Sequence, residues 1–190
     1  MRLLFPEEYD FFPQTYVLPI EFNQFRKAFF EKRNNVYIIK PEAMSQGKGI
    51  FLVKDPSEIE AKEHQVAQEY LNSPFLVDGL KFDLRIYVLL TGVNPLRIYL
   101  FEEGLARFAT ELYKPAKRDN MDNLFMHLTN YAINKKSSAY QQNDDDEAAD
   151  ESAHKRSLSS LYEHLENLGY DVKSLKLKIE DLIVKTIITA

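Results

Sequence analysis

Residues 81 to 91, with the sequence KFDLRIYVLLT, constrain the fold more than any other stretch of this chain. Charged residues alternate with apolar ones at its start. Because alternate side chains of an extended strand share a face, the pattern predicts a β-strand with Lys81, Asp83 and Arg85 on one face and the intervening residues toward the core. Charges on such a strand must pair with one another or bind a charged ligand. Two interpretations stay open: a salt-bridged surface strand, or the wall of a site for phosphates and their metal.

The composition is that of a globular protein. The 190 residues suit one domain with a sizeable core, and 45% of them are hydrophobic and 28% charged. The absence of cysteine excludes disulfides, thiolate zinc sites and cysteine nucleophiles. A net charge of -5 argues against a general nucleic-acid binder. Without a signal peptide or an apolar run of about 20 residues, we expect a cytosolic protein with no membrane insertion.

Hydrophobic periodicity predicts an α+β fold. Apolar residues recur at helical spacing over residues 21–33, 158–168 and 175–189, and Gly169 ends the second of these helices. Residues 55–60 have the Asp-Pro start and acidic first turn of another helix. Residues 1–20 are expected to be an extended segment. Apolar runs predict strands over residues 36–41, 50–53, 65–71, 96–101 and 105–110, with turns at Asn94-Pro95 and at Glu103-Gly104.

Three polar segments lie between these elements. The turn Gln46-Gly47-Lys48-Gly49 joins two predicted strands, and its backbone N–H groups could cradle a phosphate, although neither the P-loop spacing nor the dinucleotide fingerprint is present. His127 lies in a segment rich in hydrogen-bonding side chains, but a single histidine is more often a satisfied core or surface residue than a catalyst. Residues 141–154 form an acidic insert that we expect to be solvated and mobile.

Several motifs together identify a resemblance to a known family. In order and spacing they resemble the tubulin tyrosine ligase-like family over nearly the whole chain. The stretch through Asn134-Lys135 and the terminal helices is most similar to the polyglutamylase branch. The motifs are YIIKP at 37–41, QGKGI at 46–50, DGLKFDLR at 78–85, EGLARFAT at 103–110 and HLTNY at 127–131.

The resemblance implies an ATP-grasp-type fold and one catalytic domain over residues 1–190. It implies an ATP-dependent ligase that adds glutamate to glutamate side chains of tubulin C-terminal tails through an acyl phosphate. The implied cofactors are ATP and Mg²⁺, and the implied partners are α/β-tubulin or microtubules and free L-glutamate. Its implied location is the cytoplasm and cytoskeleton, including the cilium or basal body. Such chemistry needs dispersed positive charge around the transferred phosphoryl group.

The resemblance also implies roles for individual residues. Catalytic roles fall on Lys81, Asp83, Arg85 and Arg107. The fork of Arg107 would hold the carboxylate of the incoming amino acid, and Tyr131 and Lys135 would border the amino-acid pocket. The residues implied in nucleotide binding are Lys40, Gln46, Gly47, Gln68, Glu69, Tyr70, Leu71, Lys81, Phe82, Asp83, His127, Thr129 and Asn130.

Two departures from the family pattern qualify this assignment. Lys48 stands where many members have arginine, which keeps the charge but loses the fork. The family's magnesium ligands are expected beyond Ala190, so no metal ligand is assigned here, and the chain is expected to be a fragment that lacks the C-terminal metal-binding strands.

Alternative functions stay open at this point. One is a non-catalytic nucleotide- or microtubule-binding module, and another is a ligase that uses glycine or tyrosine instead of glutamate. An acidic tubulin tail would need a basic docking surface despite the net charge of -5. The candidates for it, each equally well explained as a solvated surface charge, are Lys114, Lys117, Arg118, Lys135 and Lys136.

Overall fold

The computed structural model describes residues 1, 4–31, 35–45, 47–60, 62–141 and 153–189. The chain divides into two compact units. The first unit comprises Met1–Phe11, Asp83–Phe108 and Gln141–Ala190, and the second comprises Phe12–Phe82 and Ala109–Tyr140. The chain combines helices with antiparallel strands, which confirms the predicted mixture of α and β structure. Residues 142–152, which make up most of the predicted acidic insert, lie outside the described residues.

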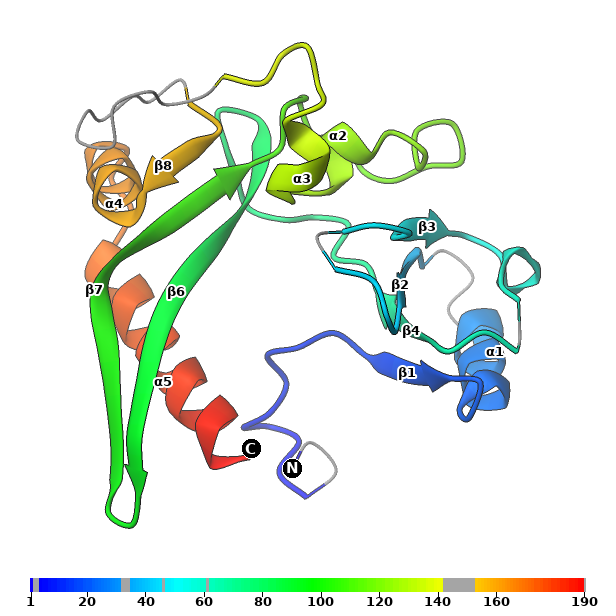
Figure 1. Cartoon of the computed structure of the whole chain (residues 1–190), viewed down its shortest axis with the longest axis horizontal. Helices are drawn as coiled ribbons and strands as arrows, with labels where there is room; N and C mark the ends of the chain where they lie inside the picture. Colours follow the sequence, from blue (N-terminus) through cyan, green and yellow to red (C-terminus); the bar gives the residue numbers. More distant parts are fainter. Residues whose placement is uncertain (2–3, 32–34, 46, 61, 142–152, 190) are drawn as a thin grey trace. The chain divides into compact units, whose positions relative to one another are not determined.

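A four-stranded antiparallel sheet forms the body of the second unit. Its strands are β1 (Thr15–Leu18), β2 (Tyr37–Pro41), β3 (Phe51–Val53) and β4 (Gln65–Glu69), in the order β1-β4-β2-β3. Helix α1 (Phe22–Glu31) packs against one face (Figure 1), as its apolar periodicity predicted. Phe25 meets Tyr37 of the sheet edge to face, with 5.0 Å between ring centroids. Burying each such ring contributes about 2 kcal/mol to folding.

The remaining elements of the second unit are short. They are η1 (Pro56–Glu58), β5 (Leu76–Val77), the start of β6, α2 (Leu124–His127) and α3 (Tyr131–Asn134). The helix predicted at residues 55–60 begins at Asp55, whose side chain caps it, but ends after one 3₁₀ turn. The helix stops because Ile59 becomes extended and joins the core beneath α1.

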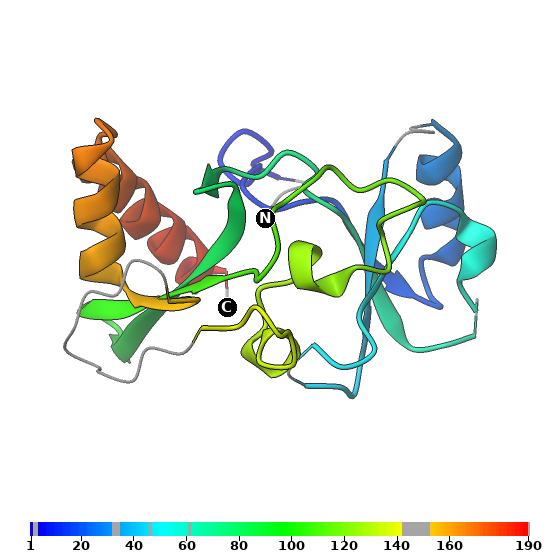
Figure 2. The same ribbon diagram turned by 90° about the horizontal axis from the view of Figure 1, so that it is seen from above.

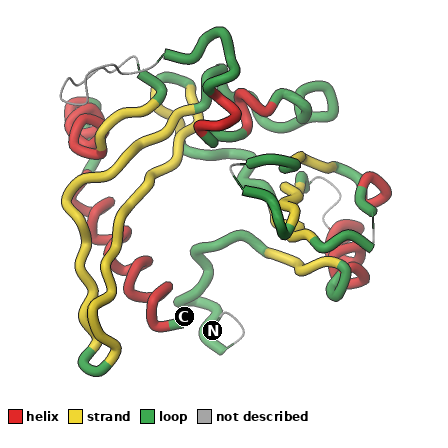
Figure 3. The backbone as a smooth tube through the Cα atoms, viewed as in Figure 1, coloured by secondary structure: helices red, strands yellow, loops and turns green. Residues whose placement is uncertain are grey.

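The first unit is built on a long hairpin. Strands β6 (Leu80–Val93) and β7 (Leu96–Phe108) are joined by a tight loop (Figure 3), which confirms the predicted strand at 81–91 and the turn at Asn94-Pro95. The sheet order is β5-β6-β7-β8, where β8 is Lys155–Ser157 and β6 runs on from the second unit into the first. Helices α4 (Leu158–Asn167) and α5 (Val172–Ile188) follow β8 and pack against each other (Figure 2), so both C-terminal helices are confirmed.

The turn predicted at Glu103-Gly104 is wrong, because β7 continues through both residues. Gly104 is buried there for a packing reason. A Cβ at this position would lie 2.4 Å from the backbone oxygen of Arg85 and 2.6 Å from Cδ1 of Leu158. Glycine therefore marks a close approach of β6 and α4 to β7 rather than a reversal of the chain.

Glu103 caps helix α4 from a neighbouring strand. Its carboxylate accepts hydrogen bonds from the backbone N–H groups of Gly104 (2.8 Å) and Leu158 (2.7 Å) and from the Ser159 hydroxyl (2.6 Å). Partial burial alone would raise the pKa of Glu103, but these hydrogen bonds outweigh it and hold the pKa below its usual range. The carboxylate thus satisfies donors that the first helical turn leaves open.

Removing this cap should weaken the first unit. We expect Glu103→Ala to lower the free energy of unfolding by about 1 to 2 kcal/mol, measured by urea denaturation. Glu102→Ala, at the exposed neighbouring position, is the matched control and should change stability by less than about 0.5 kcal/mol. Equal stability of the two variants would show that the cap does not contribute.

None of the helices in the described part of the chain is long and apolar enough to cross a membrane.

Candidate functional site

The second unit carries polar site residues on the sheet face that α1 does not cover. Directly opposed residues of antiparallel strands share a face, and the register pairs Ile38 with Gln68 and Lys40 with Val66. The adjacent residues Tyr37 and Ile39 belong to the core under α1. Alternation along β2 and β4 therefore turns Lys40 and Gln68 to the opposite face.

Lys40 is held on this face by a chain of hydrogen bonds. Its Nζ donates to Oε1 of Gln68 at 2.7 Å, Nε2 of Gln68 donates to Oγ1 of Thr15 at 2.8 Å, and that hydroxyl donates to the carbonyl of Pro13 at 2.9 Å. Burial lowers the pKa of Lys40. No carboxylate among the described residues forms an ion pair with it. A half-buried cation without an acidic partner is suited to binding an anion.

A hollow of about 320 Å³ adjoins Lys40 in the second unit. Val17 and Val66 contribute apolar walls, and Glu42 and His64 contribute exposed polar groups. The Lys40 side chain thus borders a concave surface.

A second cationic group, Lys81, lies in a cluster with Tyr70 and His127. The Lys81 ammonium donates to the Tyr70 hydroxyl oxygen at 3.0 Å and to the His127 carbonyl oxygen at 2.9 Å. It also lies over the Tyr70 ring, 4.4 Å from the centroid, where the ring quadrupole attracts a cation. Tyr70, which directly follows β4, and His127 of α2 therefore converge on the ammonium of a β6 residue.

Residues 68–71, which the resemblance implies as the segment whose backbone pairs with adenine, lie at the end of β4 and directly after it. The backbone N–H groups of Glu69 and Tyr70 already donate to the carbonyls of Gln14 and Val36, both at 2.8 Å. Pairing with adenine through this segment would therefore use its backbone carbonyl groups or the backbone N–H of Leu71, a residue that is 62% exposed. The Glu69 carboxylate accepts from Nδ2 of Asn35 at 2.6 Å.

The glycine turn lies against the segment that follows α2. Gly47 has a φ of 81°, and a Cβ there would lie 2.8 Å from Cδ1 of Ile133 and 2.9 Å from Cγ of Asn130. Only glycine fits this conformation and this approach. The predicted site residues Gly47 and Asn130 are thus neighbours, whereas Gln46 lies outside the described residues.

Asn134 supports this segment and was not singled out as a site residue. Its buried side chain accepts from the backbone N–H and the hydroxyl of Thr110, both at 3.0 Å, and donates to the Leu128 carbonyl at 2.7 Å. The signal in the sequence was its presence among apolar residues, a place where an asparagine needs partners. Close by, Thr129 is buried, and the Lys135 ammonium lies 5.2 Å from the ring centroid of the exposed Tyr131.

The first unit contains three of the remaining predicted residues, Asp83, Arg85 and Arg107. Arg107 on β7 makes a bidentate ion pair with Asp83 on β6, with Nε to Oδ1 at 2.8 Å and Nη2 to Oδ2 at 2.7 Å. The hydrogen bond to Asp83 is the largest cause that raises the pKa of Arg107, so the guanidinium stays charged. Arg85 is exposed, and Phe82, the last residue of the second unit, is half-buried.

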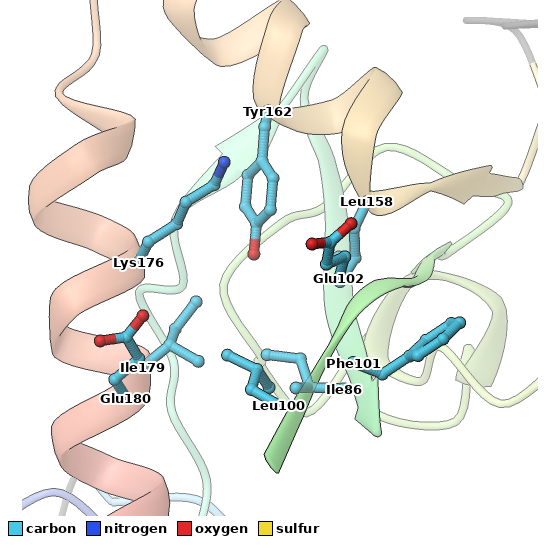
Figure 4. A pocket seen from close by; sticks show the side chains of 9 residues that line it. All are labelled: Ile86, Leu100, Phe101, Glu102, Leu158, Tyr162, Lys176, Ile179 and Glu180. Carbon is cyan, nitrogen blue, oxygen red and sulfur yellow. The ribbon is translucent and has the colours of Figure 1, made fainter. Parts of the chain in front are cut away.

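A further cavity of about 480 Å³ lies in the first unit between the hairpin and the two C-terminal helices (Figure 4). Ile86, Leu100 and Ile179 form its apolar wall, and the Lys176 ammonium lies 4.6 Å from the Tyr162 ring centroid at its rim. None of the predicted site residues lines this cavity.

The described residues contain no group of three or more His, Cys, Asp or Glu side chains placed to hold a metal ion. We therefore assign no Mg²⁺ ligand in this part of the chain.

His127 makes folding sensitive to pH. Burial lowers its pKa, as does the nearby Lys81 ammonium, while the hydrogen bond to the Asn120 carbonyl acts in the opposite direction. Because the folded state disfavours the protonated ring, the unfolded chain binds more protons below the ordinary pKa of about 6.5. The stability that the neutral His127 ring contributes is therefore complete above that pH. It is lost as the pH falls toward the lower pKa of the ring in the folded state.

We expect the free energy of unfolding to decrease between pH 7 and pH 5.5, and His127→Gln to reduce this slope. Urea unfolding at several pH values measures this pH dependence, and His64→Gln, at an exposed histidine, is the control. His154, whose pKa burial also lowers, adds to the wild-type slope but is common to all three proteins. A slope that His127→Gln leaves unchanged would refute the assignment.

Comparison with known proteins now places the chain. The model of the tubulin-tyrosine ligase family matches residues 1–190. The chain belongs to the tubulin-tyrosine ligase family. A protein of Tetrahymena thermophila named "Probable beta-tubulin polyglutamylase" is 51% identical over 192 residues, covering 100% of this chain and 16% of the relative.

Vertebrate relatives agree with this membership. Tubulin polyglutamylase ttll6 of Danio rerio is 43% identical and tubulin polyglutamylase TTLL13 of Mus musculus 44% identical, each over 190 residues and 100% of this chain. The chain covers 24% and 23% of these two proteins. This member of the tubulin-tyrosine ligase family thus spans less than a quarter of the length of the relatives named here.

Proposed function

We propose that this chain is part of an ATP-dependent ligase that adds glutamate to glutamate side chains in the C-terminal tails of tubulin. The observation that carries the proposal is the presence of two cations in the second unit, Lys40, which donates to Gln68, and Lys81, which donates to Tyr70 and to the His127 carbonyl. Membership of the tubulin-tyrosine ligase family and relatives named tubulin polyglutamylases support it. On this proposal the 190 residues belong to one catalytic domain with an ATP-grasp-type fold.

The proposed reaction has two steps. ATP supplies the phosphoryl group that converts a tubulin carboxylate into an acyl phosphate, with release of ADP. The amino group of free L-glutamate then displaces phosphate from the acyl carbon, loses a proton, and forms the amide bond. The chain's own residues bind and orient the reactants, since such transfers are accelerated mainly by positioning and by dispersed positive charge.

Most of the predicted residues have a place in this proposal. Lys40 and Lys81 bind the anionic nucleotide, and Gly47 with Asn130 brings the glycine turn to it. The segment 68–71 borders the adenine, and Thr129 completes the nucleotide contacts. Arg107, paired with Asp83, is the proposed group for the carboxylate of the amino acid. Tyr131 and Lys135 are proposed amino-acid-binding residues of the second unit. Arg85 adds exposed positive charge on β6.

The proposed protein substrate is acidic, so it needs basic docking groups. Lys114, Lys117, Arg118, Lys135 and Lys136 are all exposed in the second unit. Exposed lysines and arginines attract an acidic peptide and make its binding dependent on salt. We propose these side chains as docking groups for tubulin tails, and the cytoskeleton, including the cilium or basal body, as the working location.

Nucleotide binding tests the proposal at its first step. Isothermal titration of ATP and of GTP into the full-length protein, with Mg²⁺ present, should give saturable binding of ATP. ATP binding without amino-acid transfer to tubulin would favour the non-catalytic module. Absence of ATP binding would overturn the proposed nucleotide site.

A further inference from the structure

His127 is fully buried, yet both of its ring nitrogens have protein partners. Nε2 lies 3.1 Å from the carbonyl oxygen of Asn120, and Nδ1 lies 3.0 Å from the hydroxyl oxygen of Tyr70. The ring also meets the rings of Tyr70 and Tyr113 edge to face, with centroids 5.7 Å away in each case. The imidazole is therefore fixed in place by its surroundings.

The partners determine the direction of each hydrogen bond. The Asn120 carbonyl can only accept, so Nε2 of His127 must carry the proton. In a neutral imidazole Nδ1 is then an acceptor, and the Tyr70 hydroxyl donates its proton to it. The lone pairs of the Tyr70 oxygen are thereby turned away from the histidine and accept from the Lys81 ammonium at 3.0 Å.

The result is a directed chain of donors from Lys81 through Tyr70 and His127 to the Asn120 carbonyl. The His127 carbonyl holds the same ammonium at 2.9 Å, so the histidine fixes Lys81 through both its ring and its backbone. Burial, with the neighbouring Tyr113 hydroxyl, raises the pKa of Tyr70 far above its ordinary value, so the phenol keeps the proton that the chain requires.

We infer that Tyr70 and His127 are positioning residues for the Lys81 ammonium, which they orient toward the nucleotide. The inference rests on the proposed nucleotide site. It adds how the ammonium of Lys81, the second cation of that site, is oriented. The chain of donors works only while His127 is neutral, because a protonated ring would present an N–H at Nδ1 and displace the Tyr70 proton. The titratable groups packed against His127 are Lys81, Tyr70 and Tyr113.

A double-mutant cycle on ATP affinity tests this inference in the full-length protein. Tyr70→Phe keeps the ring but removes the hydroxyl, and we expect ATP to bind about tenfold more weakly, since hydrogen bonds to charged groups are worth this much. Lys81→Met should weaken binding by at least the same factor. In the Lys81→Met background, Tyr70→Phe should cause no further loss, because the group it positions is gone.

Matched readouts separate positioning from a general structural effect. Tyr37→Phe removes the hydroxyl of a buried tyrosine in the core under α1 and should leave ATP affinity unchanged. Nitrogen-15 NMR of the histidine rings should show His127 with Nε2 protonated and Nδ1 bare in the wild type, and this signature should change in Tyr70→Phe.

The outcomes distinguish two failures. A wild-type protein that does not bind ATP overturns the proposed site and this inference with it. ATP binding that Lys81→Met weakens and Tyr70→Phe leaves intact overturns only the positioning role. An equal loss from Tyr70→Phe in both backgrounds also overturns it, because the hydroxyl would then act independently of Lys81.

Discussion

Arg107→Ala should lower the rate of amino-acid transfer to tubulin by about a hundredfold or more in the full-length protein. The substitution removes the proposed binding group for the amino-acid carboxylate. It also leaves Asp83 without the bidentate partner that it holds at 2.7 and 2.8 Å. Arg107→Lys keeps the charge but loses the planar fork, so we expect about a tenfold loss. Initial rates with labelled amino acid measure both effects.

The control for this series is Arg97→Ala, an exposed arginine at the other end of the same strand. It should retain the wild-type rate. Thermal unfolding of each variant shows whether loss of the Asp83 pair has unfolded the first unit. A folded Arg107→Ala protein that keeps more than about a third of the wild-type rate would be incompatible with the proposed role.

Lys40→Met should raise the KM for ATP by about a hundredfold while leaving the fold intact. Methionine keeps most of the apolar stem but removes the cation that we place at the nucleotide. The same substitution should not harm stability. Because burial lowers the pKa of Lys40, the folded state disfavours its charge, and the neutral side chain should give equal or higher stability.

The matched control is Lys62→Met, an exposed lysine of the same unit just before β4. It should change neither KM nor stability. If Lys40→Met lost stability and kept its KM, Lys40 would be a structural residue and the anion-binding role would be withdrawn.

The local sequence pattern was sufficient to predict those helices and strands that are determined by residues close together in the sequence. Alternation over residues 81–91 predicted β6, the Asn94-Pro95 pair predicted the hairpin loop, and helical periodicity predicted α1 and α4. The same local reasoning failed at Gly104. The reason for a glycine there is the backbone of Arg85 and the side chain of Leu158, which lies 54 positions farther along the chain.

The site depended more strongly on contacts between distant residues. The resemblance named Tyr70, Lys81 and His127, but spacing could not reveal that the Tyr70 hydroxyl meets a histidine 57 positions away. Nor could it assign the Asp83 carboxylate to Arg107 rather than to the adjacent Lys81 or Arg85. Such pairings arise from strand register and helix docking, which a single sequence does not specify.

We propose above that this chain takes part in ATP-dependent ligation of glutamate to tubulin. The most direct test incubates the full-length protein with tubulin, Mg-ATP and labelled glutamate, glycine or tyrosine in parallel reactions, with Arg107→Ala alongside. We expect ATP-dependent incorporation of glutamate alone, lost in the Arg107 variant. Incorporation of glycine or tyrosine instead would contradict the proposed substrate, and no incorporation of any of the three, with ATP binding intact, would contradict the ligase itself.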